Sequence, residues 1–296
     1  MVSSTLLVQG LALGVLTGGL YALLASGLTL YFGVMRVVMI AHPAFLFLAA
    51  YLTYFINRVT GLDPLLSIVV LVPVFFVLGV FVQRLLVGRL DPSNMAMMSV
   101  LLTFALALLI EGGLGVVATG SYRSINVDYA TSSVRPFDLV ALPVDKLIGF
   151  GIAAVTFVAI FAVLRWTRLG QALRATIQHP TAATLVGIET DRVRGYGFGI
   201  GLATAAIGGA VLSIIDPFFP AAHWAYIGKL MAIIVVGGLG SVPGAAIAAL
   251  LLGSLEGVLQ VTWGATIAGM MFYAFLFATL LVRPYGFFGG RLAERF

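Results

Sequence analysis

Cysteine is absent from this chain of 296 residues, and charged residues are scarce. Without cysteine, the protein can form neither a disulfide framework nor a thiolate metal site. Charged residues make up 9% of the sequence (16 Lys or Arg and 11 Asp or Glu), whereas soluble domains carry about 25%. Hydrophobic residues make up 61%, and the mean hydropathy is +1.13. This composition excludes an ordinary soluble enzyme, a nucleic-acid-binding domain and a disordered chain, and it leaves a polytopic helical membrane protein.

The sequence also lacks the motifs of common enzyme classes. It contains no G-x-x-x-x-G-K-[ST] phosphate-binding loop and no H-E-x-x-H metal motif. Its three histidines, His42, His179 and His223, lie in different segments, so we expect no metal site. We therefore expect a protein that is not an enzyme, with no catalytic residues and no cofactor of its own. If the protein uses ATP, another chain must bind it.

The N-terminus lacks the basic region of a signal peptide, because the first basic residue is Arg36. We therefore expect the first apolar run to be a retained transmembrane helix. A membrane span needs about 20 predominantly apolar residues. Nine segments qualify: Leu6–Phe32, Val37–Ile56, Leu65–Gln83, Ser93–Thr119, Leu147–Leu164, Gly195–Ile215, His223–Leu239, Val242–Val261 and Thr266–Val282. The sequence predicts an all-α membrane bundle of about eight to ten transmembrane helices, forming one domain over residues 1–296.

The distribution of Lys and Arg predicts the orientation, because cytoplasmic loops are enriched in both. The polar loop 165–194 holds five Arg, the gap 84–89 holds two, and the tail holds three (Arg283, Arg291 and Arg295). The loop 120–146 has balanced charge, which favours the external side. We predict an N-terminus outside and a cytoplasmic C-terminus. Three tryptophans fall at predicted span ends, where amphipathic indoles are favoured: Trp166, Trp224 and Trp263.

Small residues at four-residue spacing indicate close helix packing, because small side chains let helix backbones approach in lipid. They form three stripes: Gly10, Gly14 and Gly18; Gly197, Gly201, Ala205 and Gly209; and Gly253 with Gly257. Such stripes are explained by generic packing within one bundle, or by a tight helix crossing or subunit interface beside a transport path.

A few polar or irregular positions inside the apolar spans are candidates for a translocation path, because charge and broken helices are costly in a bilayer. These positions are Glu256, Glu111, the pair His42-Pro43 and the segment 237–244. Each also has a plainer explanation, which is in turn a structural hydrogen bond, an interfacial position, a proline kink and a tight turn. The candidate path residues are His42, Pro43, Glu256, Gly237, Gly238 and Gly240.

The loop 165–194 contains helix signals of its own. Pro180 suits a first helical turn and Gly187 suits a helix end. A short helix with an apolar face of small residues between them would fit a groove on a cytoplasmic partner. The alternative is an amphipathic helix on the membrane surface.

Several motifs together resemble one family, the permease subunits of branched-chain amino acid ABC importers. The loop fits R-x-G-x-x-x-R-A followed by A-x-x-x-G-I. Residues 237–245 read G-G-L-G-S-V-P-G-A, and residues 283–289 read R-P-Y-G-F-F-G, which is similar to the family's closing P-x-G-x-x-G. Around His42 the family usually shows N-F-A-H-G, whereas this chain has Met39 and Pro43. Because of this departure, related small polar or carboxylated solutes stay open beside amino acids.

The resemblance implies a multi-pass permease in the bacterial inner membrane that works by alternating access. It implies a second, homologous permease subunit, two cytoplasmic ATPases that bind ATP and Mg, and a periplasmic or extracellular solute-binding protein. Membrane lipid surrounds the chain, and no nucleic acid is expected. The residues expected to couple it to the ATPases are Arg168, Arg174, Thr181, Ala182, Leu185, Gly187 and Ile188. An ion-coupled secondary transporter that works without an ATPase is the main alternative, and a membrane-embedded enzyme is a weaker one.

Overall fold

The computed structural model describes residues 4–35, 37–91, 94–135, 140–283 and 286–289. Residues of the sequence analysis that lie outside this part are Arg36, Ser93, Pro284, Tyr285, Arg291 and Arg295. The described chain is predominantly helical, which confirms the predicted fold class. Its helices are α1 (Ser4–Met35), α2 (His42–Thr60), α3 (Ser67–Leu85), α4 (Met95–Ala118), α5 (Val144–Trp166), α6 (Arg168–Gln178), α7 (Pro180–Leu185), α8 (Thr190–Ile215), α9 (His223–Gly237), α10 (Val242–Trp263) and α11 (Ala265–Val282).

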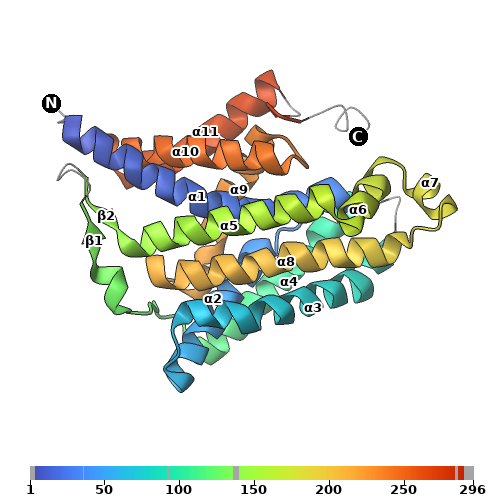
Figure 1. Cartoon of the computed structure of the whole chain (residues 1–296), viewed down its shortest axis with the longest axis horizontal. Helices are drawn as coiled ribbons and strands as arrows, with labels where there is room; N and C mark the ends of the chain where they lie inside the picture. Colours follow the sequence, from blue (N-terminus) through green and yellow to red (C-terminus); the bar gives the residue numbers. More distant parts are fainter. Residues whose placement is uncertain (1–3, 36, 92–93, 136–139, 284–285, 290–296) are drawn as a thin grey trace.

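Among the described residues, eight helical segments are long and apolar enough to cross a membrane: α1, α3, α4, α5, α8, α9 together with the 3-10 turn Pro220–Ala222 before it, α10 and α11. Figure 1 shows α1, α3, α5, α8 and α10 running roughly along the long axis of the molecule, with α11 at an angle to them. Two short strands, β1 (Ser133–Val134) and β2 (Leu142–Pro143), pair antiparallel, with Ser133 opposite Pro143. The strands lie at one end of the bundle, near the start of α1, and α6 and α7 lie at the other end (Figure 1). The chain is therefore a multi-pass membrane protein, and the side that faces the cytoplasm stays a prediction.

The second predicted span, 37–56, is helical only from His42 onward. Residues 37–41 are not helical, although Val37, Met39 and Ala41 are fully buried. Backbone polar groups in the interior of a membrane protein need partners, and α4 provides them here. Ser99 Oγ accepts a hydrogen bond from Val38 N (3.2 Å), and Thr103 Oγ1 accepts one from Ile40 N (3.2 Å) and donates one to Val38 O (3.0 Å). Helix α2 therefore begins inside the bundle.

The glycine stripes of α1 and α10 face each other within this one chain. A Cβ atom on Gly14 would lie 2.5 Å from Gly253 O, and one on Gly10 would lie 2.7 Å from Gly257 O. The stripe on α8 faces α1 and α2, because Gly201 lies against the Tyr31 ring and Gly209 against the α2 backbone. These contacts support a tight crossing inside the bundle and leave all three stripes covered by the chain itself.

Candidate functional site

A small pocket lies between α1, the first turn of α5, the end of α8 and α9. Its lining combines charged, hydroxyl and apolar side chains: Leu16, Thr17, Leu20, Tyr21, Lys146, Phe150, Ile215, Asp216 and Tyr226. The pocket offers the centres of water molecules a volume of about 20 Å³, which is room for about one water. The pocket is therefore closed to a larger solute in this structure.

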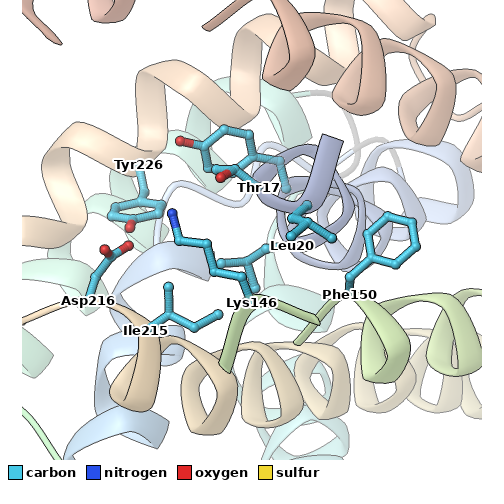
Figure 2. Close-up of a pocket in the computed structure, with 9 residues that line it drawn as sticks. Thr17, Leu20, Lys146, Phe150, Ile215, Asp216 and Tyr226 are labelled. Carbon is cyan, nitrogen blue, oxygen red and sulfur yellow. The ribbon is translucent and has the colours of Figure 1, made fainter. Parts of the chain in front are cut away.

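Lys146 and Asp216 bring opposite charges to this pocket from the ends of two helices. Lys146 lies in the first turn of α5, and Asp216 directly follows α8, where its backbone N–H donates to Leu212 O at 3.1 Å. Figure 2 shows the Lys146 side chain reaching toward Asp216 and Tyr226. Within the described part of the chain, no ion pair joins Lys146 to Asp216. The surrounding protein desolvates the Asp216 carboxylate and raises its pKa, although the charges of Lys146 and Lys229 partly oppose the shift.

A second charged pair lies beside the pocket and shares Tyr21 with it. Lys229 Nζ of α9 lies 2.6 Å from Glu256 Oε1 of α10 and donates to the Tyr21 hydroxyl of α1 at 2.9 Å. The same ammonium lies 5.3 Å from the ring centroids of Tyr21 and of Phe272 on α11. The two side chains are only 23% and 13% exposed. The pair therefore joins four helices and satisfies two charges inside the bundle.

Glu256 thus has a partner, Lys229, that was not among the residues predicted from the sequence. A lysine in the middle of an apolar span was the available signal. Glu256 Oε2 is buried and has no hydrogen-bond partner in the described chain. The structure therefore places Glu256 in an ion pair with Lys229, beside the pocket.

His42 and Pro43 start α2 and are buried, but they do not line the pocket. His42 Nε2 donates to Leu24 O of α1 at 3.1 Å, and its ring packs edge-on against Tyr31 with 5.5 Å between centroids. Pro43 lies in the first turn, where the missing N–H costs no helical hydrogen bond. Glu111 lies apart from these residues and accepts a hydrogen bond from Trp224 Nε1 at 2.8 Å.

The glycine-rich segment 237–244 forms a tight turn between α9 and α10. Gly238 (φ +95°) and Gly240 (φ +82°) adopt backbone conformations that L side chains rarely adopt. Ser241 caps α10 by accepting a hydrogen bond from Gly244 N at 3.1 Å. Residues 286–289 pack onto the turn, with Phe287 N donating to Val236 O at 3.0 Å. The turn therefore fixes the C-terminal segment against the end of the bundle.

The expected coupling residues divide between an anchored helix and an exposed one. Arg174 of α6 donates to Leu164 O of α5 at 2.5 Å, which ties α6 to the end of α5. On α7, Leu185 is 84% exposed, whereas Ala183 is buried. Gly187 (φ +85°) ends the segment, and Ile188 N donates to Ala183 O at 3.0 Å. The other expected residues on this surface are also exposed: Arg168, Thr181 and Ala182.

Within the described residues, no cluster of three or more His, Asp or Glu side chains is arranged to hold a metal ion. The charged groups described above instead serve helix packing and the lining of the small pocket.

Comparison with known proteins identifies the family. The sequence model described as "Branched-chain amino acid transport system / permease component" matches residues 10–282. The chain is 27% identical to the high-affinity branched-chain amino acid transport system permease protein LivH of Salmonella typhimurium, over 95% of both chains. It is 28% identical to a probable LivH of Methanocaldococcus jannaschii (93% of this chain, 90% of the relative) and 25% identical to BraD of Pseudomonas aeruginosa (97% of both). No solved structure matches. The chain therefore belongs to the branched-chain amino acid transport permease family.

Proposed function

We propose that this chain is one permease subunit of an ATP-driven importer. The observation that carries the proposal is the short helix α7, which lies at one end of the bundle (Figure 1) and ends on Leu185, 84% exposed, followed by Val186, 76% exposed. Burying one such aliphatic side chain is favourable by about 1.5–3 kcal/mol. A cytoplasmic ATPase with an apolar groove is the partner that would cover this face.

The way α7 is held supports a role in transmitting movement. Helix α6 is tied to α5 through Arg174, and α8 begins three residues after Gly187. A displacement of α7 by a partner would therefore reach α5 and α8 directly. Alternating access requires a contact that differs between the two states, and α7 seated in a moving ATPase groove would supply it.

The rest of the proposed assembly follows the family. A second, homologous permease would complete the membrane part, two ATPases would bind ATP and Mg, and an external binding protein would deliver the solute at the bacterial inner membrane. The relatives are named for branched-chain amino acid transport, which supports an amino acid, or a related small polar or carboxylated solute, as the cargo.

The test uses the double variant Ala182→Asp with Leu185→Asp in the assembled complex, reconstituted in proteoliposomes. Both residues are exposed, so the permease should still fold and insert. We expect ATP hydrolysis to lose its coupling to uptake. Val59→Asp is the matched control, because Val59 is also 84% exposed but lies in the last turn of α2, away from α7. Unchanged uptake and assembly in the double variant would refute the coupling role.

A separate measurement distinguishes the importer from an ion-coupled secondary transporter. The permease is purified with its natural partners and tested for co-elution with an ATPase. Co-elution and ATP-dependent uptake support the proposal. Uphill transport by this chain alone, driven by an ion gradient, would replace the proposal with the secondary transporter.

A further inference from the structure

The pocket in Figure 2 has the chemical composition of a receptor for a zwitterion that carries an apolar side chain. It presents one cation, Lys146, and one anion, Asp216, without a direct ion pair between them in the described structure. The hydroxyl groups of Tyr21 and Tyr226 add hydrogen-bonding capacity. An apolar wall, including Leu20, completes the lining.

We propose that this pocket is a docking subsite for the α-amino and α-carboxyl groups of an aliphatic amino acid. Lys146 Nζ would donate to the carboxylate, and the Asp216 carboxylate would accept from the ammonium, as charge-assisted hydrogen bonds. Leu20 and Phe150 would contact the aliphatic side chain. This inference rests on the proposed function. Its residues, Lys146 and Asp216, were not among the site residues predicted from the sequence.

The charge arrangement favours binding over simple structural pairing. The internal charges nearby are already satisfied, because Lys229 pairs with Glu256 at 2.6 Å. Lys146 and Asp216 have no such bond to each other, so a zwitterion placed between them would supply each with an opposite charge. A solute with only one charge would leave one of the two groups without a partner, and that difference provides selectivity.

The fold also connects the subsite to the helices expected to couple with an ATPase. Lys146 lies at the first turn of α5 and Asp216 at the end of α8. The opposite ends of these two helices flank α6 and α7 (Figure 1). The volume of about 20 Å³ is too small for an amino acid. Relative movement of α5 and α8 would therefore both widen the pocket and change the distance between its two charges.

The experiment measures leucine uptake by the full complex in proteoliposomes, with saturating leucine-loaded binding protein. Lys146→Met and Asp216→Asn should each lower uptake per ATP hydrolysed by about 10-fold or more, the loss expected for one charge-assisted hydrogen bond. Arg135→Met and Asp128→Asn are matched controls on the segment 120–146, which also holds Lys146 and is predicted to be external, because both side chains are exposed and neither lines the pocket. The controls should retain wild-type uptake.

A second measurement detects the solute in the pocket directly and does not depend on turnover. Because the chain has no cysteine, Thr17→Cys places a single thiol in the pocket lining. Leucine delivered by the binding protein should slow the modification of this thiol by a charged reagent, and adding Asp216→Asn should remove the protection. Equal labelling with and without leucine, or wild-type uptake in both charge variants, would overturn the subsite. ATP-dependent uptake of another small polar or carboxylated solute, but not of leucine, would overturn the subsite alone, whereas absence of all ATP-dependent uptake by the wild-type complex would overturn the proposed function.

Discussion

The crossing of α1 and α10 gives a prediction whose size follows from the structure. A Cβ atom on Gly14 would lie 2.5 Å from Gly253 O and 2.8 Å from Ser254 Cα, whereas ordinary contacts begin at 3.4 Å. The obstructing atoms belong to the backbone and cannot rotate away, so Gly14→Ala requires the two helices to separate by about 0.9 Å, the difference between 3.4 and 2.5 Å. Overpacking of this kind costs about 1–3 kcal/mol.

The net effect is smaller, because alanine favours a helix over glycine by about 1 kcal/mol. With an overpacking cost at the upper end of the range, we expect a net loss of about 2 kcal/mol for Gly14→Ala. A loss of this size lowers the unfolding midpoint by about 4 °C or more, at 2–4 °C per kcal/mol.

The assay is thermal unfolding of the purified chain in detergent, followed by intrinsic fluorescence. Gly113→Ala is the matched control, because Gly113 is also inside a helix, α4, yet a Cβ atom there would meet nothing within 4 Å. The control should unfold at or above the wild-type midpoint. If Gly14→Ala unfolds within 1 °C of the control (about 0.5 kcal/mol or less), the backbone contact between α1 and α10 does not limit packing.

Three further predictions concern the charged groups. Removing one partner of a buried ion pair costs about 3–5 kcal/mol. Lys229→Met should destabilise the chain toward the lower end of this range, because the Lys229 and Glu256 side chains keep 23% and 13% exposure. In a thermal-unfolding cycle, the double variant with Glu256→Gln should recover part of the loss, and a simple sum of the two single effects would exclude direct coupling. Glu256→Gln alone should lower uptake more than protein abundance, and unchanged uptake would make Glu256 purely structural. Burial raises the pKa of Asp216, so its ionised form is disfavoured in the fold, and Asp216→Asn should raise the unfolding midpoint at neutral pH. That gain in the unfolding midpoint should shrink as the pH falls through the raised pKa, because Asp216 then becomes protonated. A gain that does not depend on pH, or an equal gain in Asp128→Asn, would show that the buried charge of Asp216 is not its cause.

The sequence could predict the features that depend on local composition. Apolar runs of span length identified the membrane helices, because a span must satisfy its backbone hydrogen bonds internally and present apolar side chains to lipid. The three tryptophans lie at helix ends, Trp166 in α5, Trp224 in α9 and Trp263 in α10. Pro180 begins α7, and a positive φ at Gly187 follows its end. Each of these outcomes is set by the local sequence of one continuous segment of the chain.

Other features depended on contacts between segments far apart in the sequence. The start of α2 at His42 depends on hydroxyl groups of α4, which accept the backbone hydrogen bonds that a longer helix would have satisfied. The pairing of Lys229 with Glu256 joins residues 27 apart, and Tyr21 joins Lys229 across 208 positions. The pocket gathers Lys146 and Asp216 from the ends of two separate helices.

The amino-acid sequence by itself therefore determined a multi-pass helical protein, the positions of most of its spans and its family. Only the tertiary structure decided which glycine stripes face each other, which charge neutralises Glu256, and that a cation and an anion share one small pocket. The physical reason is that hydrophobic burial and helix formation act along the chain, whereas charge pairing and close packing act between surfaces whose juxtaposition only the folded bundle determines.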